Sequence, residues 1–284
     1  MKNNKHLDVF QSDKDMREKV ALWRKEGENV ALVPTMGALH DGHLSLVQQA
    51  KSIATRVVVS IFVNPTQFAE GEDFDDYPRT WDDDVKALND LGVDAIYAPK
   101  PSHMYPAGFA TEIHVSGPAL TLEGVDRPHF FKGVATVVTK LLMGVQPDYA
   151  TFGEKDYQQL MVVKRMVEDL QIPTEIIGCE TVREKDGLAM SSRNAYLTDK
   201  ERKIAPRLHE TLQSCAEKIR LGENAEFVLL EAMQTLENEG FKVDYLVLRN
   251  AETLEDVFDV EKESLRLLVA ARLGKPRLID NIGV

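Results

Sequence analysis

Residues 57–63 read Val57-Val58-Val59-Ser60-Ile61-Phe62-Val63, a nearly continuous apolar run that is rich in β-branched side chains. Such a run is typical of a strand that is covered on both of its faces. A shorter apolar run at residues 30–33 precedes it, and a helical pattern over residues 42–51 separates the two. This strand–helix–strand order predicts a parallel sheet near the start of the chain.

The same alternation continues to about residue 180. Hydrophobic periodicity predicts helices over residues 80–91, 134–145 and 157–170, and strands over residues 93–98, 149–152 and 174–178. The strongest helical pattern runs from Val134 to Val145 and is stopped by Pro147. We therefore expect an α/β fold of Rossmann-like type, with helices on both faces of a parallel sheet. In such sheets, ligands bind beyond the carboxyl ends of the strands.

The C-terminal third has a different pattern. A polar loop at about residues 181–198 is followed by helical stretches at 199–221 and 225–239, and then by strands at 243–248 and 265–271. Helices followed by strands without alternation predict a smaller α+β domain. We expect a Rossmann-like domain over residues 1–180 and a second domain over residues 181–284 that closes over the active site.

Composition excludes several classes of function. The 34 basic and 46 acidic residues among 284 give a formal charge of −12, which disfavours a nucleic-acid partner but not a local phosphate pocket. The apolar runs are too short for a membrane span, and no apolar signal segment follows Met1. Cys179 and Cys215 lack metal-ligand spacing, so we expect free thiols. These features predict a cytoplasmic protein with no membrane partner.

A first candidate site follows the strand at residues 30–33. It contains Met36, Gly37, Ala38, Leu39, His40, Asp41, Gly42 and His43. The glycines permit close approach of the backbone to a ligand, and a helix N-terminus favours phosphate. His40 and His43 are three residues apart and should project from one side as neutral donors, since the helix dipole disfavours imidazolium. The alternatives are a surface turn with incidental histidines and, less favoured for want of further ligands, a metal site.

Three further clusters are weaker when each is taken alone. The first, Met190-Ser191-Ser192-Arg193-Asn194, offers a guanidinium and hydroxyls for phosphate but also suits an ordinary surface loop. The second, Gly153-Glu154-Lys155-Asp156, joins a strand to a helix and adds a positive charge, although it could be a solvated helix cap. The third follows the strand at residues 57–63, where Asn64 and Gln67 are neutral groups suited to a small polar substrate, or a simple turn.

Together these clusters resemble known families. His40-Asp41-Gly42-His43 matches the first motif of the HIGH and KMSKS enzymes, which attack the α-phosphate of ATP, and the Met190–Asn194 loop resembles the second, with Arg193 where Lys is common. More closely, residues 33–40, 62–68, 77–79, 153–160 and 187–194 match the motifs of the pantothenate synthetase family in order. The likeness runs from about residue 30 to 206 and, more weakly, over Leu278-Ile279-Asp280-Asn281.

The resemblance implies an AMP-forming ligase that joins (R)-pantoate to β-alanine through a pantoyl adenylate, using ATP and Mg²⁺ on the route to coenzyme A. It also implies a homodimer formed through the N-terminal domain. His43 would act as the acid that assists pyrophosphate departure, while His40, Lys155 and Arg193 would supply donors to the phosphates. Gln67 and Gln159 would hold pantoate, with Gln67 also near β-alanine. The implied ATP contacts are residues 36–43, 153–156, Val182 and residues 190–193.

No metal ligand is expected from the protein itself. The carboxylates of Asp82, Asp83 and Asp84 are interpreted as a capped, dipole-favoured helix start, and Mg²⁺ as carried by the ATP phosphates.

Three other functions remain to be weighed. Another nucleotidyltransferase, such as pantetheine-phosphate or nicotinamide-nucleotide adenylyltransferase, would need a further cationic subsite, whereas Gln67 and Gln159 are neutral. A non-catalytic nucleotide-binding regulator would lack the catalytic groups, which are all present. A dehydrogenase is disfavoured because no Gly-x-Gly-x-x-Gly motif follows the first apolar strand.

Overall fold

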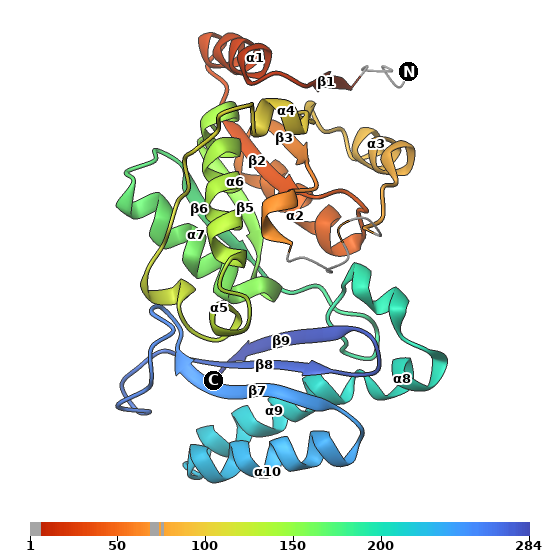
Figure 1. Cartoon of the computed structure of the whole chain (residues 1–284), viewed down its shortest axis with the longest axis vertical. Coiled ribbons are helices and arrows are strands. Elements are labelled where there is room, and N and C mark those ends of the chain that lie inside the picture. The colour runs from red at the N-terminus through yellow and green to blue at the C-terminus, as the bar shows by residue number, and fades with distance from the viewer. Residues whose placement is uncertain (1–6, 69–73, 75–76) are drawn as a thin grey trace. The chain divides into compact units, whose positions relative to one another are not determined.

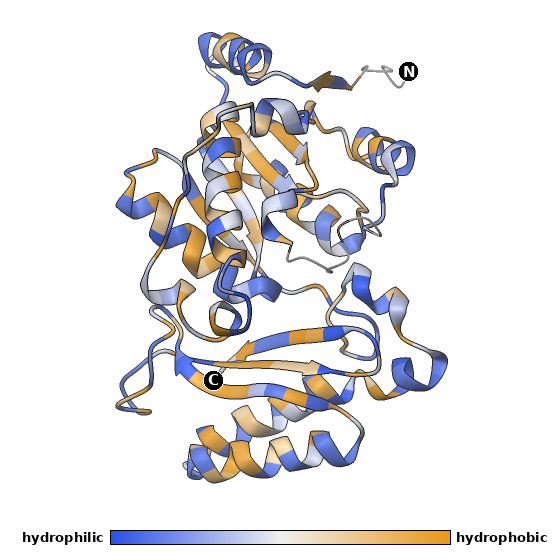
Figure 2. Ribbon diagram, viewed as in Figure 1, coloured by the Kyte–Doolittle hydropathy of each residue, from blue (hydrophilic) through white to orange (hydrophobic). Residues whose placement is uncertain are grey.

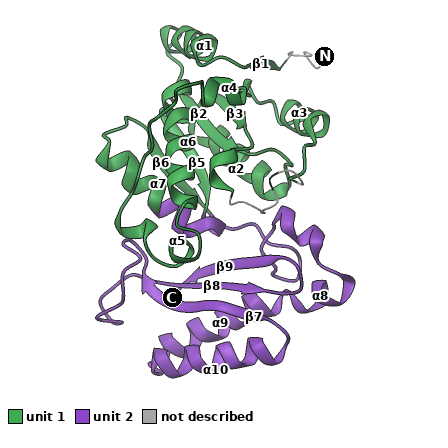
Figure 3. Ribbon diagram, in the orientation of Figure 1, with its two compact units in different colours: residues 1–153, 162–179 green, residues 154–161, 180–284 purple. Residues whose placement is uncertain are grey.

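The computed structural model describes residues 7–68, 74 and 77–284 of the chain (Figure 1). The chain forms two compact units (Figure 3). The first extends to Gly153 and includes Val162–Cys179, and the second consists of Glu154–Met161 and Glu180–Val284. The sequence predicted a boundary between residues 180 and 181. The units instead divide between Cys179 and Glu180, and the segment Glu154–Met161 also belongs to the second unit.

The first unit is built on a parallel sheet of six strands among the residues described. Their order across the sheet is β1-β4-β3-β2-β5-β6. The strands are β1 (Asp8–Phe10), β2 (Val30–Thr35), β3 (Arg56–Ile61), β4 (Ala95–Tyr97), β5 (Tyr149–Gly153) and β6 (Glu175–Cys179). Because the chain order reverses direction between β2 and β5, the carboxyl ends of these two neighbours form the topological switch point, where ligands bind in open α/β sheets.

Helices cover both faces of this sheet. Side chains of α2 (Asp41–Ile53) and α3 (Trp81–Asp90) pack in one core with Ala31, Val33 and Val57. The alternate residues Leu32 and Val58 point to the other face, where α6 (Phe130–Val145) contacts β2 and also α1 (Asp13–Lys25). The remaining elements are η1 (Pro65–Gln67), α4 (Pro101–Met104), η2 (Gly117–Ala119), α5 (Glu123–Asp126) and α7 (Tyr157–Asp169), whose first residues belong to the second unit. Figure 2 shows β2 and β3 mostly in hydrophobic colours, as burial on both faces requires.

The second unit is an antiparallel sheet in the order β7-β8-β9, covered on one face by two helices. Its strands are β7 (Lys242–Asn250), β8 (Leu265–Arg272) and β9 (Arg277–Gly283). The covering helices are α9 (Arg207–Arg220) and α10 (Ala225–Asn238), and the unit also contains η3 (Glu154–Asp156), η4 (Ser192–Tyr196) and α8 (Asp199–Ile204). The predicted fold class, a Rossmann-like sheet followed by a smaller α+β part, is confirmed.

Several local features differ from the prediction. The helix expected over residues 199–221 is interrupted at Ala205 and Pro206, since proline cannot donate to the preceding turn. Strand β1 and helix α1 were not predicted, although Ser12 accepts from the backbone N–H groups of Lys14 and Asp15 as a helix N-cap should. Strand β9 was not predicted either.

Within the described ranges, no helix is both long enough and apolar enough to span a bilayer.

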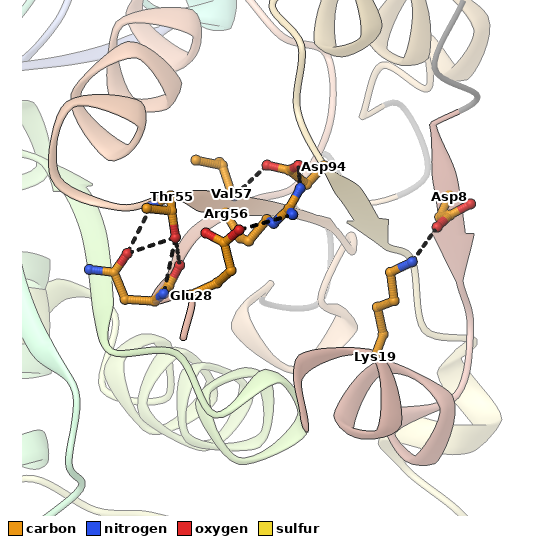
Figure 4. A network of polar contacts seen from close by, with 8 residues as sticks. Asp8, Lys19, Glu28, Thr55, Arg56, Val57 and Asp94 are labelled. Atoms are coloured by element: carbon orange, nitrogen blue, oxygen red, sulfur yellow. Dashed lines mark hydrogen bonds and ion pairs between the residues drawn. The ribbon is translucent and has the colours of Figure 1, made fainter. Parts of the chain in front are cut away.

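A polar network fixes the amino ends of the central strands (Figure 4). Arg56 at the start of β3 forms ion pairs with Asp94 at 2.9 Å and with Glu28 at 3.1 Å. The hydrogen bond to Asp94 raises the pKa of Arg56. The other oxygen of Asp94 accepts from Val57 N at 3.0 Å. One carboxylate, with only 11% of its side chain exposed, therefore joins the start of β3 to the segment that leads into β4.

We predict that Asp94→Ala lowers the free energy of unfolding by about 1–3 kcal/mol, because it leaves Val57 N and Arg56 without this acceptor. Urea denaturation measures the change. The control is Asp90→Ala, which removes the exposed i,i+4 pair with Lys86 and should change stability by about 0.5 kcal/mol or less. Equal effects of the two substitutions would contradict the assigned role of Asp94.

Candidate active site

The two histidines of the first candidate site lie where β2 leads into α2. His40 is the N-cap of α2, and its Nδ1 accepts from Gly42 N at 3.2 Å. His43 Nδ1 accepts from His40 N at 3.4 Å, and the two ring centroids are 4.1 Å apart. A nitrogen that accepts a hydrogen bond carries no proton, so a neutral ring here has its proton on Nε2. The two rings lie on one side of the helix start, as the spacing predicted, and a neutral ring at either position would donate from Nε2.

A buried carboxylate holds the backbone of the histidine loop, residues 36–43. Asp84 Oδ2 accepts from Ala38 N at 3.0 Å, and Oδ1 accepts from Leu39 N at 2.9 Å and from Thr80 Oγ1 at 3.1 Å. Ala38 has φ +51°, a left-handed conformation that is strained for a residue with a side chain. The two N–H bonds to Asp84 therefore stabilise a turn that its own sequence disfavours.

Gly37 belongs to the same arrangement. Its φ is +84°, and a Cβ at this position would lie 3.0 Å from Asp84 Oδ2. From the sequence, Asp82–Asp84 were expected only to form a capped helix start. Helix α3 does begin there, but its N-cap Thr80 makes no side-chain capping bond, and Asp84 is used by the histidine loop instead. Asp84 was missed as a site residue because its partners are 45 and 46 residues away in sequence.

The neutral amides of the third weak cluster lie beside this loop. Asn64 Nδ2 donates to Gln67 Oε1 at 3.1 Å, and Gln67 Nε2 lies 3.1 Å from Met36 Sδ. Tyr105, which was not predicted from the sequence, donates from its hydroxyl to Asn64 Oδ1 at 2.6 Å, and burial raises its pKa. The structure thus brings Met36 from the expected ATP loop against the expected pantoate ligand Gln67.

Close packing against α6 fixes the turn that carries Gln67. A Cβ on Gly133 would lie 2.5 Å from Thr66 O, so only glycine permits this approach. Gly133 O accepts from Asn64 Nδ2 at 3.2 Å, and Arg127 Nη2 donates to Gln67 O at 3.3 Å. Gly133 and Arg127 were also missed, since a glycine inside a strong helical pattern gives no sign of what it faces.

In the second unit, Lys155 lies in the short turn η3, which continues directly from β5. Its Nζ is 3.6 Å from Asp156 Oδ1, and 21% of its side chain is exposed. The amide of Asn281 donates to Glu154 O at 2.9 Å and to Lys155 O at 3.0 Å. Gln159 follows in the first turn of α7 and is partly buried. The turn is therefore anchored by a side chain of β9 that was not assigned to the site from the sequence.

The remaining candidate residues lie on, or directly after, a hairpin of the second unit formed by residues 182–190. Met190 N donates to Val182 O at 3.0 Å, which places these two predicted ATP contacts opposite each other. Beyond the hairpin, Ser191 Oγ accepts from Arg193 N at 3.3 Å and begins η4. The hairpin strands are joined by an isolated bridge between Arg183 and Ala189. The structure brings the predicted loop residues together within this unit.

In the parts of the chain that the structure describes, no group of three or more His, Cys, Asp or Glu side chains could hold a metal ion.

Comparisons with known proteins show which family the chain resembles. Residues 8–283 match the family described as pantoate-beta-alanine ligase. A pantothenate synthetase of Bradyrhizobium sp. (strain BTAi1) is 54% identical over 277 residues, covering 97% of this chain and 98% of that relative. A pantothenate synthetase of Rhodopseudomonas palustris (strain HaA2) is 55% identical over 92% of this chain and 93% of its own length.

Solved structures give the same result. A pantothenate synthetase from Thermus thermophilus superposes with a TM-score of 0.90 at 45% identity, covering 97% of this chain and 99% of that one. A pantoate-beta-alanine ligase from Francisella tularensis, solved in complex with beta-gamma ATP and beta-alanine, gives a TM-score of 0.81 at 36% identity over 98% of this chain and 97% of that one. The motifs, the fold and a sequence identity of 54% over 97% of the chain all agree. The chain therefore belongs to the pantoate–β-alanine ligase family.

Proposed function

We propose that the chain condenses (R)-pantoate with β-alanine at the expense of ATP, giving pantothenate, AMP and pyrophosphate. The observation that carries this proposal is the contact between the ATP loop and a neutral amide pair. Met36 of the histidine loop touches Gln67, and Gln67 is held by Asn64. A small hydroxy acid bound by these amides would lie beside the nucleotide, as adenylation of its carboxylate requires.

The reaction has two steps, because a carboxylate is a poor electrophile. In the first, a carboxylate oxygen of pantoate attacks the α-phosphorus, the bond to the β-phosphate breaks, and pyrophosphate leaves. In the second, the neutral amine of β-alanine attacks the acyl carbon of pantoyl adenylate, expels AMP and loses a proton. Neither step needs a covalent bond to the protein, so the protein acts by positioning and charge stabilisation.

The Nε2–H groups of His40 and His43 are suited to the first step. Both Nδ1 atoms accept backbone N–H groups, so each ring is held in one orientation with a donor at Nε2. We assign His43 as the acid that assists pyrophosphate departure and His40 as a further phosphate donor. The N-terminus of α2 adds N–H groups and dipole character that favour the same anion.

Further phosphate contacts are assigned to the second unit, where Lys155 and Arg193 supply the positive charges. Backbone and side-chain contacts to ATP are also assigned to Gly153, Glu154, Asp156, Val182 and residues 190–193, and pantoate contacts to Gln67 and Gln159. Mg²⁺ would be carried by the ATP phosphates, as such sites commonly require few protein ligands. We further propose a homodimer and a cytoplasmic location.

The neutral amide side chains of Gln67 and Asn64 favour a ligase over a nucleotidyltransferase of the same superfamily. A phosphate nucleophile would need cations beside the nucleotide. The side chain of Gln67 contacts Asn64 and Met36, and the nearby guanidinium of Arg127 donates to the main-chain oxygen of Gln67. The products distinguish the two activities, since a ligase releases AMP and forms an amide.

An omission assay tests the function directly. With ATP, Mg²⁺ and pantoate but no β-alanine, we expect one equivalent of pyrophosphate per active site and no multiple turnover. AMP should be released only after β-alanine is added. Formation of a dinucleotide, or AMP release without β-alanine at the full rate, would contradict the ligase assignment.

Two substitutions of His43 test which ring nitrogen acts. His43→Asn keeps an acceptor near the Nδ1 position and removes the ε donor, whereas His43→Gln keeps an amide donor near the Nε2 position. We expect single-turnover pyrophosphate release to fall by about 10²–10³ for His43→Asn and by less for His43→Gln. The reverse order would mean that His43 serves only to hold the helix start.

Substitution of Gly133 tests whether the turn that carries Gln67 positions pantoate. Gly133→Ala should favour the helix by about 1 kcal/mol, yet its Cβ would displace Thr66. We expect KM for pantoate to rise about tenfold, equivalent to one lost hydrogen bond, with KM for ATP little changed.

The control is Gly283→Ala, where the nearest atom to the added Cβ is Leu265 O at 4.0 Å. This variant should keep the parent KM for both substrates. An unaltered pantoate KM in Gly133→Ala would show that the close contact with α6 has no part in substrate binding.

A further inference from the structure

Two adjacent polar residues of β9 are buried on opposite faces of the small sheet. Asp280 pairs in register with Val269, which belongs to the core under α9 and α10, and Asn281 pairs with Leu268. Side chains alternate along a strand, so Asp280 points toward the helices and Asn281 toward the other face. Asp280 is 4% exposed and Asn281 is 3% exposed. Polar residues so deeply buried in a strand need specific partners.

The partners of Asn281 belong to the Lys155 turn. Its Nδ2 donates to Glu154 O at 2.9 Å and to Lys155 O at 3.0 Å, and its Oδ1 accepts from Arg266 Nε at 2.8 Å. Arg266 in turn contacts Glu154 Oε2 at 3.0 Å and stacks 4.0 Å from the ring of Tyr157. The amide thus uses both donors and its acceptor to hold the backbone from which the Lys155 side chain extends.

The partners of Asp280 belong to the hairpin of the second unit. Arg183 makes a bidentate pair with it, with Nη1–Oδ2 at 2.7 Å and Nη2–Oδ1 at 2.9 Å. Arg183 Nη1 also donates to Gly187 O at 3.1 Å, and His209 Nδ1 lies 3.4 Å from Asp280 Oδ2. Burial alone would raise the pKa of Asp280, but the proximity of His209 and the two hydrogen bonds from Arg183 outweigh it and lower the pKa. The carboxylate is therefore a stable anion that fixes the hairpin leading to Met190.

We propose that Asp280 and Asn281 are positioning residues that set, from one strand, the relative places of the two ATP-contacting segments of this unit, Glu154–Asp156 and Met190–Arg193. The inference rests on the proposed roles of Lys155 and Arg193. Apolar residues of similar volume would fill a core at least as stably as a buried ion pair. Asp280 and Asn281 instead provide hydrogen-bond partners that hold the two loops in one geometry, which apolar side chains could not do.

A double-mutant cycle between Asn281 and Lys155 tests the first arm of the proposal, in which Asn281 positions the Lys155 turn. Asn281→Asp keeps the shape and the contact to Arg266 but replaces the donor by an oxygen facing two carbonyl oxygens. We expect single-turnover pyrophosphate formation at saturating ATP to fall on the order of 10²-fold, as misplacement of a catalytic group can cause. In the Lys155→Ala background the same substitution should change the rate by about threefold or less, since coupled residues are not additive.

The outcomes distinguish the role of Lys155 from that of Asn281. If Lys155→Ala keeps near-normal adenylation, the proposed role of Lys155 fails, and this arm of the inference fails with it. If Lys155→Ala is impaired but the two losses multiply, Asn281 does not act through Lys155, and only this inference fails. Should Asn281→Asp not fold, Asn281→Ala provides the same comparison, because water can enter a polar site vacated by an amide.

The matched control is Asn224→Ala, which deletes the side-chain cap of α10 in the same unit. It should lower Tm without altering the adenylation rate, which shows that lost stability alone does not reproduce the effect. A rate loss in Asn224→Ala equal to that in Asn281→Asp would overturn the positioning role.

The second arm of the proposal, in which Asp280 positions the Arg193 loop, is tested in the same way with Asp280→Asn and Arg193→Ala. Asp280→Asn keeps the shape but weakens the bidentate pair with Arg183. We expect a higher KM for ATP in the parent background and little further change once Arg193 is absent. Independent, multiplicative effects would overturn the link between Asp280 and the Arg193 loop.

Discussion

The position of both histidines depends on one buried carboxylate. Asp84 accepts the N–H groups of Ala38 and Leu39 and so stabilises a left-handed residue just before the N-cap of α2. Without that acceptor the turn would leave two N–H groups unpaired and Ala38 in a strained conformation, costs of about 1–3 kcal/mol each. The helix start, the N-cap geometry of His40 and the orientation of His43 all follow from this turn.

The same construction recurs in each candidate segment. The Gln67 turn is held by Asn64 and by contact with Gly133, the Lys155 turn by Asn281, and the hairpin before Met190 by the Arg183–Asp280 pair. In each case a buried residue fixes a loop by specific contacts. Asn281 binds main-chain oxygens of its loop, whereas Asp280 binds a side chain, that of Arg183. The groups assigned to the substrates then extend from a backbone that is already ordered. Such preorganisation suits a reaction in which the protein forms no bond to the substrates.

Sequence patterns predicted the fold class and the loop positions because both are local properties. The buried strand at Val57, the periodic helix from Val134 and the His40–His43 spacing are each visible within about 15 residues. Since β2, β3 and β5 are parallel neighbours, the loops that follow them start from the same edge of the sheet, and the resemblance of their motifs supplied the chemistry. The change of architecture near residue 180 was likewise visible in the loss of strand–helix alternation.

The anchors could not be predicted because each acts across a long sequence separation. Asp84 lies 46 residues from Ala38, and Asn281 lies 126 residues from Lys155. Asp84 was hidden among three consecutive aspartates that suit any helix start. Strand β9 was missed for a related reason, since Asp and Asn are disfavoured in strands and here interrupt an otherwise apolar run. The residues that break the strand pattern are those that bind the loops, as expected where local preference yields to function. A departure from local pattern at a buried position therefore indicates where this fold orders its loops.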